Sequence, residues 1–116
     1  MRIFHIATPE DWAAAQRTGT YTTSTLGRSL AEEGYIHAAF EDQWPLVLRR
    51  YYAEVYTPLL LLEIDTERLR SLIVEEQPAP GVEAIYPHIY GPLNVDAVVG
   101  THDVSRPLDP EPRPET

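Results

Sequence analysis

The most informative segment of the sequence is Tyr86-Pro87-His88-Ile89-Tyr90-Gly91-Pro92-Leu93. His88 and Tyr90 are two positions apart, so on a β-strand both side chains point to the same face of the sheet. Pro87 and Pro92 stiffen the backbone at either end, and Gly91 permits an immediate turn. A short, rigid strand that presents an imidazole and a phenol predicts one wall of a pocket. The same residues also fit an edge strand whose rings help to fill a small core.

Length and composition indicate one small domain. The chain has 116 residues, of which 43% are hydrophobic, and we expect a single domain over residues 1–104. Residues 105–116 are rich in proline and charge, which predicts a disordered, acidic tail. The sequence contains no cysteine. Its absence excludes a disulfide framework, a thiolate metal site and a cysteine nucleophile.

The charge balance limits the kinds of ligand and partner that the protein is expected to bind. The net charge is -9, and all nine basic residues are arginine, which excludes a Schiff-base lysine. An acidic chain is a poor general binder of nucleic acid, although a local arginine can still attract a small anion. No apolar run is long enough to span a bilayer, and the N-terminal residues do not resemble a signal peptide. We therefore expect a cytoplasmic protein that does not bind membranes, and no feature indicates its oligomeric state.

Short strands and helices follow one another along the chain. Thr8 is a suitable cap for a helix that runs from Pro9 to about Arg17, and Asp42 is a suitable cap for a second main helix that reaches Tyr51. About six strands with two main helices placed early predict an α+β fold with a mostly antiparallel sheet. A further short helix is expected over residues 26–33, strands over 2–7, 35–39, 59–64, 73–77, 85–90 and 95–101, and an extended segment or loop over 21–25.

Three of the four histidines fall inside expected strands, namely His5, His37 and His88. A single strand histidine is usually a partly buried residue with its own partners. Three in one small domain favour a shared site, because unpaired buried imidazoles are costly. Three imidazoles and a water also form a known zinc site, but no HxH or HxxxH pair is present, so zinc is the less favoured alternative. His102 is expected at the surface.

Other polar residues allow two interpretations each. Arg28 lies near the start of an expected short helix, where its charge and free backbone N–H groups could meet an anion. The alternative is an arginine exposed to solvent. The acidic pairs Glu32-Glu33 and Glu75-Glu76 are expected to form solvated faces.

The order of several segments resembles the bacterial DUF952 family of small proteins. The similarity covers about residues 2 to 104. Its most specific parts are the Glu-Gly-Tyr-Ile-His segment at 33–37 and the Pro-His-Ile-Tyr-Gly-Pro-Leu segment at 87–93. The other matching segments are the strand with His5, Pro9-Glu10-Asp11-Trp12, the residues from Ser29 onward, and Leu61-Leu62-Glu63-Ile64-Asp65.

This resemblance implies a fold similar to ADP-ribosyltransferases, which bind NAD in a cleft between two small, mostly antiparallel sheets. It places His5 where those enzymes hold a ribose and His37 where they stack the nicotinamide. His88 or Tyr90 falls on the strand that carries their glutamate, so His37, His88 and Tyr90 become the candidate catalytic residues. His5 becomes a candidate cofactor-binding residue, and Tyr21 and Arg28 join it at the rim of the cleft.

Two functions follow from the resemblance. The first is a module that binds a nucleotide-type ligand, NAD or ADP-ribose, in a cleft lined by histidine and tyrosine, with or without catalysis. The second is an active ADP-ribosyl transferase or NAD glycohydrolase. A transferase needs an acid to steady positive charge on the ribose as nicotinamide leaves. The nearest acid in the sequence is Glu83, five residues before His88, and this distance favours the binding module.

Overall fold

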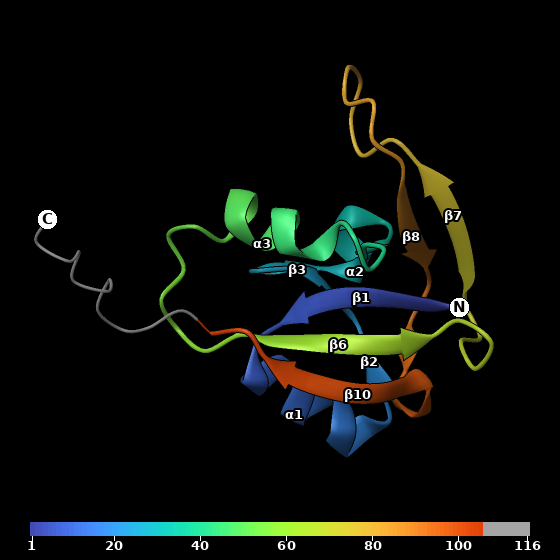
Figure 1. The fold of residues 1–116 in the computed structure, drawn as a ribbon. Coiled ribbons are helices and arrows are strands. Elements are labelled where there is room, and N and C mark those ends of the chain that lie inside the picture. Colours follow the sequence, from blue (N-terminus) through green and yellow to red (C-terminus); the bar gives the residue numbers. More distant parts are fainter. Residues whose placement is uncertain (106–116) are drawn as a thin grey trace, which may run out of the picture.

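The computed structural model describes residues 1–105 and shows an α+β fold (Figure 1). Within this range it has two three-stranded sheets, two two-stranded ribbons and three α-helices, and every strand pair is antiparallel. The expected α+β class with mostly antiparallel sheets is therefore confirmed. Apart from Ser105, the expected tail lies outside the described residues.

The central sheet has the strand order β1-β6-β10, formed by Arg2–Ala7, Leu60–Asp65 and Val98–Asp103 (Figure 1). The strand expected over 95–101 begins later, because Val95–Ala97 form a turn of 3-10 helix, η1. The Asn94 side chain donates to the Asp96 carboxylate across 2.5 Å. Such a local side-chain bond competes with strand pairing and explains the late start of β10.

The side sheet has the order β5-β8-β7, formed by Ile36–His37, Tyr86–Tyr90 and Leu72–Glu76. The strand expected over 35–39 is shorter, because the chain leaves β8 after His37 and bridges to β1 instead. There, Phe4 and Ala39 exchange two backbone hydrogen bonds of 2.8 Å. This bridge joins the side sheet to the free edge of β1, so side chains of both sheets come close together.

Two main helices are present, as expected. Helix α1, Pro9–Thr18, begins where Thr8 accepts a hydrogen bond from the backbone N–H of Asp11, and it ends at Gly19. Helix α3, Trp44–Tyr51, has no side-chain cap, so the expected cap at Asp42 is wrong. Gln43 precedes this helix, and its side chain bonds the N–H of Phe40 and the carbonyl of Ile85 instead.

The helix expected over 26–33 is wrong in its first half. Gly27 has a φ of 71°, and the turn that it makes lets Arg28–Ser29, β4, pair with Thr23–Thr25, β3. Only Leu30–Glu33 are helical, as α2, with a capping box between Ser29 and Glu32. The segment 21–25 is extended as expected: Thr20–Tyr21, β2, pairs with Leu93–Asn94, β9, and β3 follows.

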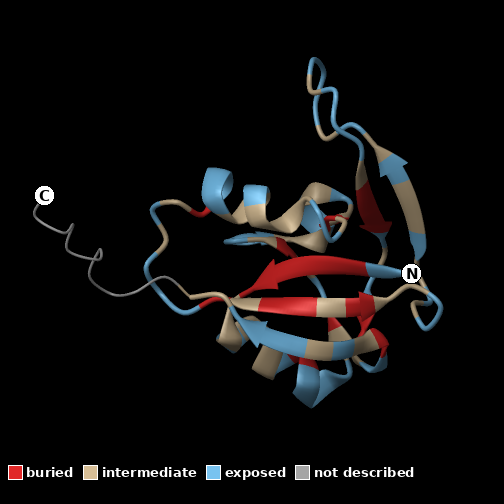
Figure 2. Ribbon diagram, in the orientation of Figure 1, coloured by how far each residue is buried: buried red, intermediate tan, exposed pale blue. Residues whose placement is uncertain are grey.

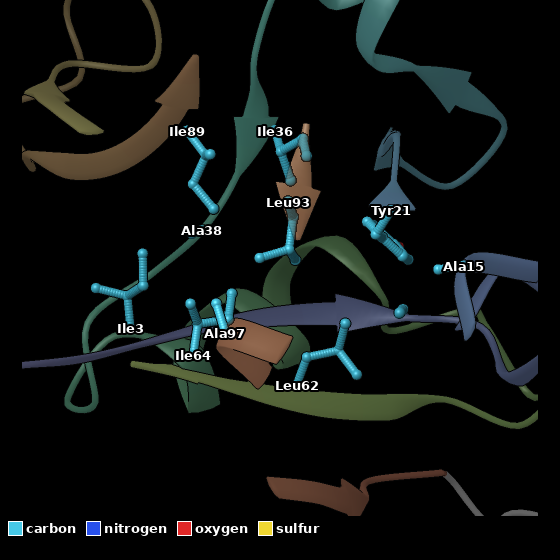
Figure 3. Packing of buried hydrophobic residues seen from close by; sticks show 11 residues of the cluster. Ile3, Ala15, Tyr21, Ile36, Ala38, Leu62, Ile64, Ile89, Leu93 and Ala97 are labelled. Carbon is cyan, nitrogen blue, oxygen red and sulfur yellow. The ribbon is translucent and has the colours of Figure 1, made fainter. Parts of the chain in front are cut away.

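Apolar side chains cover both faces of the central sheet. On one face, Ile36, Ile89 and Leu93 lie opposite Leu62 and Ile64 in the main core (Figure 3). The other face carries a second cluster beneath α3. Figure 2 shows the result: β1 and β8 are mostly buried, β6 is buried or intermediate, β7 is intermediate or exposed, and β10 is mostly exposed. The second cluster consists of Phe4, Ile6, Tyr52, Leu59 and Leu61, with Trp44, Val47 and Leu48 of α3 packed against it.

Candidate functional site

The two faces of the side sheet differ in chemistry. In register across β5, β8 and β7, Ile36, Ile89 and Ile73 occupy one face and pack into the main core. The neighbouring row, His37, His88 and Val74, occupies the opposite face. Because side chains alternate along a strand, this second face also carries Tyr35, Glu76, Tyr86 and Tyr90. We call it the polar face.

A cavity of about 310 Å³ lies where the polar face meets β1 and α3. This volume falls at the lower end of the range typical of small-molecule sites, about 300 to 1,000 Å³. The wall is mainly apolar, and its aliphatic residues include Ile6, Ala38, Ala39 and Val47. Three imidazoles also line the cavity: His5, His37 and His88. Its aromatic residues are Phe4, Trp44, Tyr51, Tyr52 and Tyr86.

His88 is 1% exposed and has a carboxylate partner. Its Nδ1 donates to Oε1 of Glu76 across 2.9 Å, and the hydroxyl of Tyr90 donates to the same oxygen. These two bonds, that of Tyr90 first, lower the pKa of Glu76, and the carboxylate in turn raises the pKa of Tyr90 to about 12. Among residues 1–105, the buried side-chain atom without a hydrogen-bond partner is Nε2 of His88.

Tyr35 and His37 hold the His88 ring in place. The Tyr35 ring stacks on His88 with centroids 4.1 Å apart, and the His37 ring meets it edge-on at 5.4 Å. Nε2 of His37 is 3.6 Å from Glu33, whose other oxygen pairs with Arg28 at 2.8 Å. Burial, and then the electrostatic effect of the neighbouring His88, lower the pKa of His37. At neutral pH the cavity therefore presents neutral His37 beside its aromatic walls.

His5 lines the cavity, but its polar atoms are already engaged. Nδ1 lies 2.5 Å from the carbonyl oxygen of His37 and must therefore donate to it. Nε2 then accepts from the hydroxyl of Tyr21 across 2.9 Å. Burial lowers the pKa of His5 to about 4 and raises that of Tyr21, so both groups are neutral. Neither nitrogen of His5 is available to a ligand in this arrangement.

The six residues expected at the site are thus placed in different ways. His5, His37 and His88 share the cavity wall. Tyr90 lies beside the cavity on the polar face and is connected to it by a hydrogen bond to Glu76, which in turn bonds His88. Tyr21 is 1% exposed, so its expected place at the rim is wrong: it belongs to the main core. Arg28 is exposed, outside the lining, and directed to Glu33.

Sequence reasoning missed Glu76, which was expected on a solvated face. In the structure Glu76 pairs with Tyr86, and its side chain reaches along the polar face to His88 and Tyr90. Because this residue is twelve positions from His88, only the register of β7 on β8 makes them neighbours. Tyr35 was missed for a related reason, since it precedes β5 and joins the site through ring stacking.

The zinc alternative has no support in this geometry. No group of three or more His, Cys, Asp or Glu side chains in residues 1–105 is arranged to hold a metal ion. His5 in particular has both nitrogens committed to protein groups. In the same part of the chain, no helix combines the length and apolar character that crossing a membrane requires.

Comparisons with known proteins agree on the family. The model of the family described as "Protein of unknown function (DUF952)" matches residues 6–101. The chain is similar to the crystal structure of protein CC0527 from Caulobacter crescentus, with 26% identity, a TM-score of 0.73, and coverage of 89% of this chain and 85% of that one. The solution NMR structure of CC0527 shares the fold, at 24% identity, a TM-score of 0.65, and coverage of 90% and 84%. Comparison with curated proteins found no match. The chain therefore belongs to the DUF952 family.

Proposed function

We propose that the cavity binds a small ligand with a planar ring, of the nucleotide class that includes NAD and ADP-ribose. The observation that carries the proposal is the wall itself, in which five aromatic rings and three imidazoles surround about 310 Å³. Aromatic walls stack on flat rings, and a few polar groups orient them. A nicotinamide or adenine ring is flat, partly apolar and has polar edges, so it matches this lining.

The charges beside the cavity suggest how such a ligand is oriented. The lining residues, all in the described part of the chain, include no arginine. Arg28 is linked to His37 through Glu33, and it is exposed. A phosphate buried among apolar walls and carboxylates is unfavourable. The ring of the ligand therefore enters the cavity, and its phosphates remain in solvent.

A second candidate is an ADP-ribosyl transferase or NAD glycohydrolase, on a fold similar to ADP-ribosyltransferases. Glu76 favours it, because this carboxylate supplies an acid next to His88 and Tyr90. In that reaction the bond between nicotinamide and ribose breaks, and nicotinamide leaves with the electron pair. Water or an acceptor hydroxyl forms the new bond to the ribose and loses its proton to a base. A carboxylate–imidazole pair is suited to receive that proton.

Isothermal titration with NAD and with ADP-ribose tests the binding proposal. We expect saturable heat with at least one of the two, and affinity about tenfold weaker in His37→Ala, which removes a half-buried side chain from the wall. His102→Ala is the matched control, since this exposed histidine bonds Glu63 on the central sheet. No heat with either ligand would contradict the proposal. Release of nicotinamide from NAD during the titration, followed by chromatography, would favour the second candidate.

A further inference from the structure

The hydrogen bond to Glu76 determines which nitrogen of the neutral His88 ring carries the proton. The carboxylate of Glu76 can only accept a hydrogen bond, so Nδ1 of His88, 2.9 Å away, carries the proton. In the neutral ring the other nitrogen, Nε2, then has a lone pair and no proton. This atom has no partner among residues 1–105, while its residue is 1% exposed and lines the cavity.

We infer that Glu76 and His88 form a hydrogen-bond-accepting anchor, which selects ligands that bring a neutral N–H or O–H donor into the cavity. The inference rests on the proposed function and states which chemical group the edge of the ligand ring must carry. Suitable donors are a carboxamide, an exocyclic amine or a hydroxyl. A ring that carries a carboxylate lacks the donor and is excluded.

The neighbouring charges support the same selection. Glu76 lies behind the His88 ring, and Glu33 lies 3.6 Å from Nε2 of His37. The polar face therefore has a carboxylate next to each of its two histidines, and Arg28 is paired with one of them. An anion near the two rings meets repulsion and loses its hydration, whereas a neutral donor satisfies a buried acceptor that otherwise costs free energy.

His5 shows that a buried histidine in this wall can have partners for both nitrogens, unlike His88. His5 is also buried in the same wall, but its Nε2 accepts from Tyr21. Buried polar atoms are nearly always bonded, and the exceptions require an explanation. A ligand that donates to Nε2 of His88 provides one.

Long-range ¹H–¹⁵N NMR of the histidine side chains tests the inference with nicotinamide and nicotinate as probes. We expect the neutral His88 ring of the free protein to carry its proton on Nδ1 and not on Nε2. Nicotinamide should shift the Nε2 resonance, with affinity at least about tenfold higher than nicotinate. A proton on Nε2, equal binding of the two probes, or no response of Nε2 to nicotinamide would overturn the inference.

Substitutions on β7 provide matched variants. Glu76→Gln removes the fixed acceptor behind the ring, so the second tautomer should appear and the preference for nicotinamide over nicotinate should fall by about tenfold. Glu75→Gln makes the same change one position away, on the other face of the strand, opposite Pro87, and should leave both properties unchanged. A loss of preference in Glu75→Gln, or its retention in Glu76→Gln, would count against the anchor.

NAD provides the third arm, which separates the two proposals. If NAD binds without shifting Nε2 of His88, the proposed function stands and the anchor is wrong. If NAD fails to bind but nicotinamide shifts Nε2, the anchor stands and the nucleotide assignment is wrong.

Discussion

His5 on the central sheet and His88 on the side sheet are both almost fully buried, at 3% and 1% exposure, yet they are satisfied differently. His5 uses both nitrogens, one to the His37 carbonyl and one to the Tyr21 hydroxyl, and so connects β1 to β5 and β2. His88 uses one nitrogen, towards Glu76. The difference shows that burial alone does not distinguish the two histidines, whereas the unpartnered nitrogen of His88 does.

The positions of the two sheets explain this contrast. The central sheet is covered by apolar clusters on both faces, so a polar side chain there must find its partners within the protein. The isoleucine face of the side sheet packs into the main core, and β7 stands at the outer edge of this sheet (Figure 1). Its polar face borders the cavity instead. Four predictions test the contrast, from the largest expected effect to the smallest.

Replacement of His5 by phenylalanine should strongly destabilise the protein. The variant keeps an aromatic ring at this position, but the His37 carbonyl and the Tyr21 hydroxyl lose their partner in the core. Two such groups cost about 3 to 4 kcal/mol in the free energy of unfolding, measured by urea denaturation. Adding Tyr21→Phe removes one orphaned group and should recover about 1 kcal/mol. A loss below about 1 kcal/mol in the single variant would contradict a structural role for His5.

Acid should weaken the fold through the same residue. Burial lowers the pKa of His5 from 6.5 to about 4, so between these values the unfolded chain binds a proton that the folded chain does not. Stability is therefore full above pH 6.5 and falls as the pH drops towards 4, by about 3 kcal/mol. His37, whose pKa is also lowered by burial, acts in the same direction. Urea unfolding at stepped pH should show this slope in the native chain and in His102→Gln, and a flatter one in His5→Phe.

His88→Phe should abolish ligand binding with little effect on stability, whereas His5→Phe mainly reduces stability. The variant loses the bond to partly exposed Glu76, but it also removes a buried nitrogen that has no partner. These effects offset each other, so the free energy of unfolding should change by less than about 1 kcal/mol. Binding of nicotinamide should nevertheless be lost. Destabilisation equal to that of His5→Phe would mean that the two histidines have the same structural role.

Tyr90→Phe should have the smallest effect. The Tyr90 ring is 40% exposed, so removal of its hydroxyl should change stability by no more than about 0.5 kcal/mol. The hydroxyl is the larger of the two bonds that lower the pKa of Glu76, and its loss should raise that pKa towards the ordinary value. A ¹³C NMR titration of the Glu76 carboxyl measures the change. An unaltered titration would show that Tyr90 does not donate to Glu76 in solution.

Sequence reasoning predicted the features that local chemistry determines. Thr8, Pro9 and Gly19 define both ends of α1 from the sequence alone. The segment around His88 was expected to be a strand that forms either a pocket wall or an edge strand. It is the central strand of the side sheet, and Tyr86 and His88 line the cavity. In both cases the signal lies within about ten neighbouring residues.

Features that depend on pairing between distant segments could not be predicted in the same way. Glu76 reaches His88 through the register of β7 on β8, and Tyr21 becomes buried because β2 pairs with β9. Residues 26–33 favour a helix locally, but Arg28–Ser29 pair with β3, so the first half of that segment is not helical. Tertiary contacts override local preference at each of these places.

Chemical-shift mapping with NAD tests the central claim most directly, that the cavity beside the polar face is a ligand site. Aromatic and histidine side-chain resonances would be followed as NAD is added to the full-length chain. We expect saturable shifts at His37, His88 and Trp44, which line the cavity, and none at His102 on the central sheet. Shifts centred on His102, or no shifts at saturating NAD, would contradict it.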